Sequence, residues 1–322
     1  MSFVRTVLGD VAPSSLGATY AHEHVIIDVG PLTERDPDWR LDSADDAVRE
    51  LGPARALGLG TVVDALPCAL GRDPRKLGEV SRRSGVHVVA STGLHVADLY
   101  GPDHWSATAA EDELARLFMA DIEEGIDDHD HAGPSVRRGR HRAGVVKVGG
   151  SREMATERDR RVFRAAAAAQ RATGCPILTH CSDGVGGLEQ VRLLAEAGAD
   201  LGHVVLSHTD KVVDRAYHRE LLATGVSVEY DQGFRWKDGQ DNGTLILLDW
   251  MLEDGHGDQL MLGLDAARRS YWTVHGGRPG WTFLLGAFSE AMARHGIDEA
   301  ARRRMLFDTP ARVYAFGEVP PA

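Results

Sequence analysis

Cysteine is scarce in this sequence, and its longest apolar runs are only as long as a β-strand. The chain has three cysteines, Cys68, Cys175 and Cys181, an odd number that is too small for a disulfide framework. We therefore expect reduced thiols and a cytoplasmic protein. The opening residues 1–6 hold no apolar run of the kind that signal peptides need. We expect neither a signal peptide nor a membrane-spanning segment.

An excess of positive charge is also missing. The chain has 36 Lys and Arg against 48 Asp and Glu, which gives a formal net charge of −12. This balance argues against nucleic acid or an anionic membrane as the main partner. Hydrophobic residues make up 43% of the chain, as in globular proteins with a substantial core. We therefore expect a small-molecule substrate.

Strand-length apolar stretches alternate with amphipathic stretches of helical length along the chain. After a first strand that contains His22, the expected strands are 61–66, 87–93, 143–148, 176–180, 203–208, 226–230 and 259–265. Alternation of this kind predicts a parallel sheet, and eight units most simply close into an α/β fold, the (β/α)8 TIM barrel. The alternative is a doubly wound open sheet, but no Gly-x-Gly-x-x-Gly follows the first strand. Because no linker interrupts the pattern, we expect one domain over 1–322.

One segment breaks the alternation. A helix is expected over 108–126, and the following residues 127–142 are first acidic and then basic, with glycine and proline among them. This composition predicts an exposed excursion between a helix and the next strand.

Two histidines stand close together near the start of the chain. His22 and His24 are separated by one residue, so a β-strand would present both on one face as a chelate for a metal such as zinc. The pair alone is weak evidence, because the chain has 15 histidines. Further ligands at the ends of other strands would strengthen it.

Such ligands occur at three more strand ends. His180, His208 and Asp265 each terminate an apolar run. The carboxyl ends of the strands are where barrel enzymes carry out their chemistry, so these side chains are expected to meet the His-x-His pair. Four histidines and a carboxylate together predict a metal site.

Lys147 lies inside an apolar run on the fourth expected strand. A buried ammonium beside metal ions would suffer desolvation and like-charge repulsion. One interpretation is that its amine reaches a carboxylate at the barrel end. The other is that desolvation lowers its pKa and the neutral amine adds carbon dioxide, which gives a carbamate that can bridge two metals. Both interpretations stay open at this point.

Five short motifs carry a family resemblance. The stretches 21–24, 146–149, 179–180, 207–210 and 263–265 resemble the metal-site motifs of the phosphotriesterase-like group of the amidohydrolase superfamily. The stretches 63–67, 71–74 and 310–312 match further motifs of the group. The spacing between the motifs is similar to that of its shorter-loop lactonases, and the resemblance covers nearly the whole chain.

The resemblance implies a binuclear metal centre. In it, His22, His24 and Asp265 would hold the more buried ion, and His180 and His208 the more exposed one. An N6-carboxylated Lys147 and a hydroxide would bridge two divalent ions, with Zn as the first expectation and Co, Mn or Fe tolerated. Asp265 would be the catalytic residue that accepts the proton of the hydroxide and passes it to the leaving group.

Two positions depart from the family pattern. His95 stands at the end of the third strand, where family members often carry an aromatic residue. It could hydrogen-bond to substrate or hydroxide, or it could simply face water. Thr309 replaces the asparagine of the C-terminal Asn-Pro-Ala-Arg motif, which we interpret as a structural change.

The loops after strands seven and eight are expected to set the substrate. Lys237, Arg268 and Tyr271 resemble the phosphate-binding set of sugar-phosphate lactonases in the family. The alternative is that Arg268 or Arg269 pairs with acids at the barrel edge and that Lys237 is merely solvated.

The sequence therefore predicts a metal-dependent hydrolase that opens an anionic lactone, with a sugar-phosphate lactone as one candidate. A phosphotriesterase, esterase or amidohydrolase acting on another small substrate is the alternative. A barrel that binds a small ligand without turnover would need a broken metal site, and no expected ligand is missing. A homodimer is the expected assembly.

Overall fold

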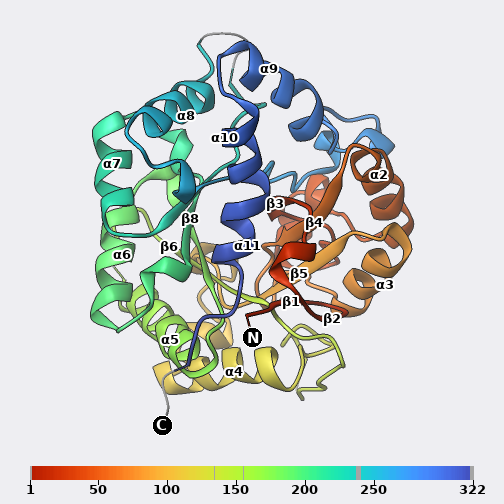
Figure 1. Cartoon of the computed structure of the whole chain (residues 1–322). Coiled ribbons are helices and arrows are strands. Elements are labelled where there is room, and N and C mark those ends of the chain that lie inside the picture. Colours follow the sequence, from red (N-terminus) through yellow and green to blue (C-terminus); the bar gives the residue numbers. More distant parts are fainter. Residues whose placement is uncertain (1, 134, 155, 237–240, 320–322) are drawn as a thin grey trace.

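The computed structural model is a barrel of eight parallel strands (Figure 1) and describes residues 2–133, 135–154, 156–236 and 241–319. The strands are β3 Ala18–Glu23, β4 Leu59–Asp64, β5 His87–Thr92, β6 Val145–Gly150, β7 Ile177–Cys181, β8 Val204–Ser207, β9 Ser227–Tyr230 and β10 Leu260–Leu262. They are hydrogen-bonded in chain order from β3 to β10. The Asp265 N–H donates to the His22 carbonyl at 3.1 Å, which joins the two ends of the sheet. The predicted (β/α)8 barrel is confirmed.

Helices surround the strands (Figure 1). They are α1 Pro31–Arg35, α2 Ala44–Ala56, α3 Pro74–Ser84, α4 Glu111–Glu123, α5 Glu157–Thr173, α6 Gly187–Glu196, α7 Arg215–Ala223, α8 Gly243–Glu253, α9 Ser289–Arg294, α10 Glu299–Arg303 and α11 Thr309–Val313. The helix expected over 108–126 is shorter at both ends. It starts late because the Glu113 carboxylate accepts the Ala110 N–H at 2.9 Å, and it stops before Gly125, which has a φ of 139°.

The interior of the barrel explains where the polar residues go. One small apolar cluster takes a buried residue from most strands: Ala21, Val63, Val89, Val145, Leu178, Val205 and Met261. Side chains on a strand alternate between its two faces, so the residue two positions further on shares the interior face. Lys147 follows Val145 in this way, and His180 follows Leu178. The carboxyl end of the barrel therefore receives a polar layer above an apolar one.

A short hairpin, which the sequence did not predict, lies at the amino-terminal side of the barrel. Strands β1 Val4–Thr6 and β2 Gly9–Val11 pair antiparallel, and the Val7 N–H donates to the Val88 carbonyl of β5 at 2.8 Å. At the other end of the chain, the Thr309 hydroxyl donates to the Asp258 carbonyl at 3.2 Å. This contact agrees with a structural role for Thr309.

The expectation of an exposed excursion at 127–142 is confirmed for residues 132, 133, 135–137 and 140, but it is wrong for most of the acidic part that precedes them. Asp127, Asp130 and His131 of this segment are buried. The reason is Arg72, a fully buried guanidinium that lies 3.1 Å from the Asp130 carboxylate and 3.2 Å from Asp121 of α4. A buried cation requires paired carboxylates, and the acidic half of the segment folds inward to supply one of them.

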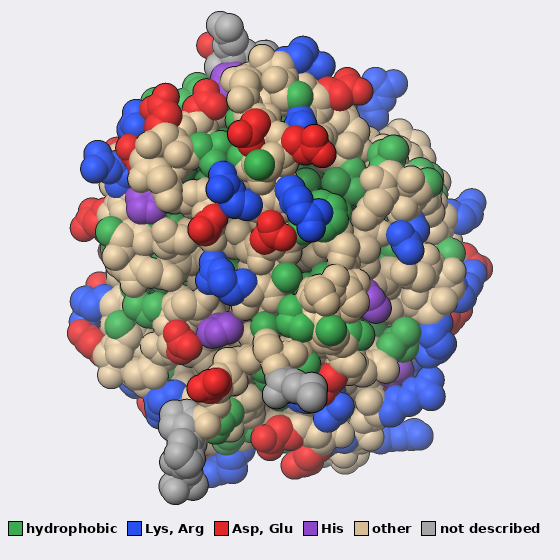
Figure 2. Space-filling view, viewed as in Figure 1, with side chains coloured by type: hydrophobic (Ala, Val, Ile, Leu, Met, Phe, Trp, Pro, Cys, Tyr) green, Lys and Arg blue, Asp and Glu red, His purple; other side chains and the backbone are tan. Residues whose placement is uncertain are grey.

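Charges of both signs are interspersed over the face of the molecule that carries α10 and α11 (Figure 2). Several Lys and Arg side chains gather at the lower right edge of this face, beside α3 and β2. Among the described residues, no helix is both long enough and apolar enough to cross a membrane.

Candidate active site

A cavity of about 230 Å³ opens at the carboxyl ends of the strands. Expected metal ligands form one part of its wall, and the rest is mostly apolar and comes from the loops that follow the strands. The expected ligands that line it are His22, His24, Lys147, His180, His208 and Asp265, and the other lining residues include His95, Leu32, Trp39, Leu66, Leu70 and Leu99. The structure therefore brings all six expected ligands to one enclosed site.

The His-x-His pair meets the carboxylate from the far end of the chain. The Asp265 Oδ1 atom lies 3.3 Å from His24 Nε2 and 3.9 Å from His22 Nε2. Potential ligand atoms of these three residues all lie within 4.8 Å of one another. Two imidazoles and a carboxylate at such distances can chelate one divalent ion.

The remaining expected ligands extend this group across the cavity. The His208 ring lies between those of His22 and His180, with ring centroids 4.6 Å apart in each case. Lys147 comes from β6, and its Nζ donates to the Thr179 carbonyl at 3.2 Å. These residues are arranged so that a second ion could sit beside the first.

The protonation of these groups suits metal binding. Burial, reinforced by the nearby Lys147 charge, holds the pKa of His22 well below its usual range, and burial does the same for His180. Neutral imidazole is the form that binds metal. Burial also lowers the pKa of Lys147 to about 8, despite the carboxylates of Asp265 and Glu229 nearby. The residues present therefore fit a pair of divalent ions.

Two of the ligands adopt an unusual backbone conformation. His208 has a φ of 65° and Asp265 a φ of 48°, both in the left-handed region that L-residues seldom occupy. Such strain tends to persist at functional sites, where the surrounding structure fixes it. Here the bond from the Asp265 N–H to His22 and the bond from the Ala267 N–H to the Asp265 carbonyl, at 2.8 Å, hold the turn.

A buried glutamate fixes the His-x-His pair and Asp265 relative to each other. Glu23 lies between His22 and His24 in the sequence, and its carboxylate accepts the N–H groups of Leu264 at 2.8 Å and Ala266 at 3.2 Å. These two residues flank Asp265. A single side chain on β3 therefore clamps the loop that carries the ligand after β10. This role of Glu23 is not apparent from the sequence alone.

Other acids at strand ends brace the site in the same way. The Asp64 carboxylate accepts the Val25 N–H at 2.7 Å, and Asp210 accepts the N–H groups that follow β9. Asp231 pairs with the Nδ1 atom of His208. A carboxylate at this position fixes the ring and leaves Nε2 for a metal. The signal in the sequence was an acidic residue directly after an apolar run, which also occurs at ordinary turns.

His22 is oriented from below by two polar residues. Its Nδ1 atom lies 2.9 Å from Ser207 Oγ and 3.6 Å from Glu229 Oε2. Burial, together with the neighbouring charges of Asp231 and Asp210, raises the pKa of Glu229 well above its usual range. Ser207 and Glu229 direct the Nε2 atom of His22 towards Asp265. The sequence hint to a role for Glu229 is that it is a charged residue type within an apolar strand.

His95 lines the cavity, and the structure fixes its ring. Its Nδ1 atom accepts the Val96 N–H at 2.8 Å, its own backbone N–H donates to the Tyr100 hydroxyl at 2.9 Å, and Arg158 donates to its carbonyl at 3.0 Å. Burial holds its pKa well below the usual range, so the ring is neutral. The proton therefore sits on Nε2, which makes that atom a hydrogen-bond donor. Its ring centroid lies 4.4 Å from that of His180.

The expected cationic residues of the loops, Arg268 and Lys237, are not among the described residues that line the cavity. Arg268 does not line the cavity; its Nη1 atom lies 2.6 Å from Asp36 Oδ2, and its guanidinium lies 4.6 Å from the ring centroid of Trp39. The pairing with a barrel-edge acid, which the sequence left open, is therefore present. Trp39, over which Arg268 lies, is part of the cavity wall. Lys237 lies outside the described residues.

Tyr271 contacts Arg235, a cation that was not among the residues expected at the site. Its ring packs edge-on against Phe234, with centroids 5.1 Å apart, and Arg235 lies 5.2 Å above it. The Arg235 guanidinium donates to the Asp265 carbonyl at 2.8 Å and lies 3.5 Å from its Oδ2 atom. Arg235 therefore connects the loops after β9 and β10 at the expected catalytic carboxylate.

A parallel barrel that presents histidines, a carboxylate and a buried lysine at the carboxyl ends of its strands defines a class, the metal-dependent hydrolases of the amidohydrolase fold. The chain belongs to the Phosphotriesterase family, whose sequence pattern it matches over residues 2–314. It is a hydrolase of that family.

Named relatives are similar over nearly the whole chain. A phospho-furanose lactonase of Mycoplasmopsis synoviae is 31% identical, with 98% of this chain and 92% of the relative covered. A solved amidohydrolase structure from Mycoplasma synoviae has a TM-score of 0.93 at 30% identity and covers 99% of this chain and 93% of that one. A lactonase structure from Listeria monocytogenes has a TM-score of 0.90 at 26% identity, with 98% and 100% covered.

Proposed function

We propose that this protein is a binuclear metal-dependent lactonase that opens an anionic lactone, with a phosphorylated sugar lactone as the favoured substrate. The observation that carries the proposal is the set of six donor side chains around one small cavity. The names of the relatives, among them phospho-furanose lactonase, support the choice of substrate class.

The donor set divides into two ligand groups. His22, His24 and Asp265 would hold one ion, His180 and His208 the other, and an N6-carboxylated Lys147 would be shared. When bound, two divalent ions supply Lewis-acid polarisation of the substrate carbonyl and a water of lowered pKa. Zn is the expected metal, with Co, Mn or Fe as alternatives, and a homodimer in the cytoplasm stays our expectation.

The chain's own residues supply the remaining steps. Asp265 accepts the proton of the attacking water and delivers it to the alkoxide that leaves when the ring opens. The Nε2–H of His95 donates a hydrogen bond to an oxygen of the substrate. Trp39 and the leucines of the wall keep bulk water away from the reacting carbonyl.

One of the proposed anion-binding residues, Arg268, lies over Trp39, which forms part of the cavity wall. Arg268, Tyr271 and Lys237 would bind the terminal phosphate. The ion pair between Arg268 and Asp36 is part-exposed, so a dianionic phosphate can compete with the carboxylate for the guanidinium. A cavity of about 230 Å³ suits a small sugar lactone better than a bulky ester.

A panel of lactones with and without a terminal phosphate tests this proposal. We expect the phosphorylated members to have a kcat/KM at least about tenfold higher, because a charge-assisted hydrogen bond contributes on the order of 1.5–3 kcal/mol. Arg268→Gln should remove this preference while it leaves the neutral lactones unchanged. Arg269→Gln is the matched control, since Arg269 bonds to the Arg40 carbonyl rather than lying over Trp39.

Equal rates on charged and neutral lactones would refute the anionic specificity but not the lactonase activity. Faster turnover of a phosphotriester or an amide than of any lactone would support the alternative hydrolase functions instead. Metal analysis after growth with added zinc addresses the remaining alternative. Fewer than two equivalents together with no turnover would point to a barrel that only binds its ligand.

A pair of amide substitutions tests the role of His95. The side-chain amide of glutamine can reach the position of Nε2, whereas that of asparagine reaches only the position of Nδ1. We expect His95→Gln to retain most of kcat and His95→Asn to lose about tenfold or more, as for a lost hydrogen bond to a reacting group. Steady-state kinetics at saturating lactone measure the difference. Equal kcat values for both variants would contradict a donor at Nε2.

A further inference from the structure

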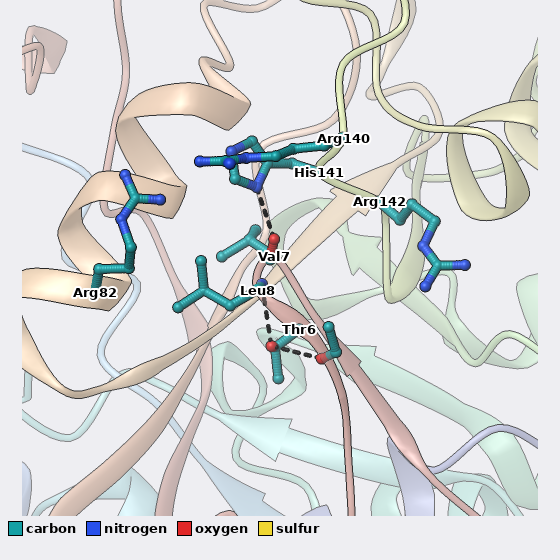
Figure 3. A pocket seen from close by; sticks show the side chains of 8 residues that line it. Thr6, Val7, Leu8, Arg82, Arg140, His141 and Arg142 are labelled. Carbon is teal, nitrogen blue, oxygen red and sulfur yellow. Dashed lines mark hydrogen bonds between the residues drawn. The ribbon is translucent and has the colours of Figure 1, made fainter.

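A second cavity, of about 420 Å³, lies away from the active site. Its walls come from the turn of the β1–β2 hairpin, the C-terminal turn of α3 and the stretch that leads into β6 (Figure 3). These segments lie at the amino-terminal side of the barrel, because α3 ends just before β5 begins. The active site lies at the opposite ends of the strands.

The charge on the wall of this cavity has one sign. Arg82, Arg140, Arg142 and His141 line it, and no Asp or Glu is among the described residues that do so. In the described part of the chain, Arg82 and Arg140 form no ion pair, and the nearest carboxylate oxygen to Arg142 is 3.9 Å away on Asp10. These guanidiniums are therefore largely uncompensated on a chain of net charge −12.

A neighbouring arginine, by contrast, is paired with carboxylates. Arg83 follows Arg82 in α3, and its guanidinium pairs with Asp45 at 2.6 Å and with Glu79 at 2.7 Å. Arg82 and Arg140 both line the cavity, and in Figure 3 their guanidiniums lie on the same side of it. Both side chains are exposed, and an anion bound between them would be attracted by two positive charges.

The backbone that presents Arg140 is held in place. The His141 carbonyl accepts the Ile126 N–H at 2.8 Å, and the His141 Nδ1 atom lies 2.7 Å from the Val7 carbonyl. Gly78 of α3 makes room for this ring, since a Cβ there would lie 2.4 Å from His141 Cε1. The end of the segment 127–142 is therefore held in one position between α3 and the hairpin.

The cavity continues into a second hollow of about 570 Å³, which shares Arg82, Arg140 and His141 with it. Arg75 and Lys76 line this hollow together with the acids Asp73, Glu79 and Asp128. Lys76 is paired with Asp28, and Arg75 lies 3.6 Å from Asp73. The unpaired cations are therefore concentrated where the two hollows meet.

We propose that the cavity at Arg82 and Arg140 binds the phosphate group of a small phosphorylated metabolite at a second site, distinct from the active site. Guanidinium groups present paired N–H donors that match the geometry of phosphate oxygens. The volume is in the range of small-molecule sites and exceeds what a lone phosphate fills. Arg142 and the hairpin turn would contact the rest of the ligand.

Calorimetric titration with inorganic phosphate and with pyrophosphate tests the proposal. Arg82→Gln/Arg140→Gln should weaken the binding of pyrophosphate at this site by at least about tenfold, because two charge-assisted contacts are lost. Arg268→Gln should leave this binding unchanged, which separates it from any phosphate bound at the active-site rim. Arg192→Gln/Arg294→Gln is the matched control, since it removes the same charge from exposed helix positions elsewhere.

Thermal unfolding without added anion shows whether the double variant folds like the parent protein. If pyrophosphate binds equally well to the parent and to Arg82→Gln/Arg140→Gln, the cavity is not the site and the proposal is wrong. The absence of any binding at millimolar concentration would also overturn it. Loss of binding in the charge control as well would show general attraction to the surface rather than a site.

Discussion

Replacing Lys147 by methionine is expected to abolish lactone hydrolysis and yet to stabilise the metal-free protein. The lysine is 1% exposed, and the only hydrogen bond of its amine to a described residue is to the Thr179 carbonyl. Burial lowers its pKa to about 8 from 10.5. A shift of this size corresponds to a cost of about 3 kcal/mol for keeping the charged amine in the folded state.

The direction of the pH dependence follows from the proton count. Between about pH 8 and 10.5 the unfolded chain binds a proton at Lys147 that the folded chain does not. The free energy of unfolding of the metal-free protein therefore rises with pH across this window and stays at its lower level below it. Lys147→Met should remove that rise and be more stable at pH 7 by up to about 3 kcal/mol, because methionine has a similar length and no charge.

Activity should change in the opposite direction. Without the amine no carbamate can form, so we expect the metal content to fall below two equivalents and kcat to drop by about a thousandfold or more. Elemental analysis, denaturant unfolding after chelation, and lactone kinetics measure the three effects. Lys76→Met is the control, since Lys76 is partly exposed and pairs with Asp28. A Lys147→Met enzyme with full metal content and normal kcat would refute the bridging role.

Much of the fold was predictable, because each strand is an apolar run and every expected ligand except Lys147 lies at the end of one. His180 and His208 follow runs of β-branched and aliphatic residues, and a barrel brings such ends together whatever the loops do. The position of Lys147 was predictable for the same reason, as two residues after Val145 on the interior face. Local sequence carried this information because strand alternation is a short-range property.

The supporting residues were not predictable, because their partners are distant in the sequence. Glu23 clamps the loop at Asp265 across more than two hundred residues, and the acid that pairs with Arg268, Asp36, is equally distant from it. The acidic part of 127–142 looked exposed because nothing nearby shows that Arg72 is buried. In each case the partner depends on tertiary packing, which a single sequence does not reveal.

The second large effect is expected at Asp265. Asp265→Asn should lower kcat for lactones by about 10²–10⁴, the usual contribution of a positioned acid–base group. Asparagine has nearly the same shape and tolerates the left-handed φ of 48°, so the turn after β10 should be kept. Its amide oxygen can still contact a metal, but it cannot accept a proton at neutral pH.

The environment of the carboxylate keeps it ionised before the reaction. Burial alone would raise the pKa of Asp265, but the hydrogen bond from His24 and the nearby charges of His208 and Arg235 outweigh it and hold the pKa well below its usual range. The group is therefore ionised throughout the neutral pH range. In Asp265→Asn the Arg235 guanidinium loses its carboxylate partner but keeps its bonds to the Leu264 and Asp265 carbonyls.

Metal content distinguishes a proton acceptor from a mere ligand. If Asp265→Asn keeps two equivalents of metal and loses kcat, its carboxylate acts on the proton of the attacking water. If metal content and kcat fall together, and both recover at high metal concentration, its role is ligation alone. Asp231→Asn serves as the comparison, because Asp231 touches His208 rather than the cavity. That variant should lose about 10–100-fold in metal affinity and recover kcat once it is saturated with metal.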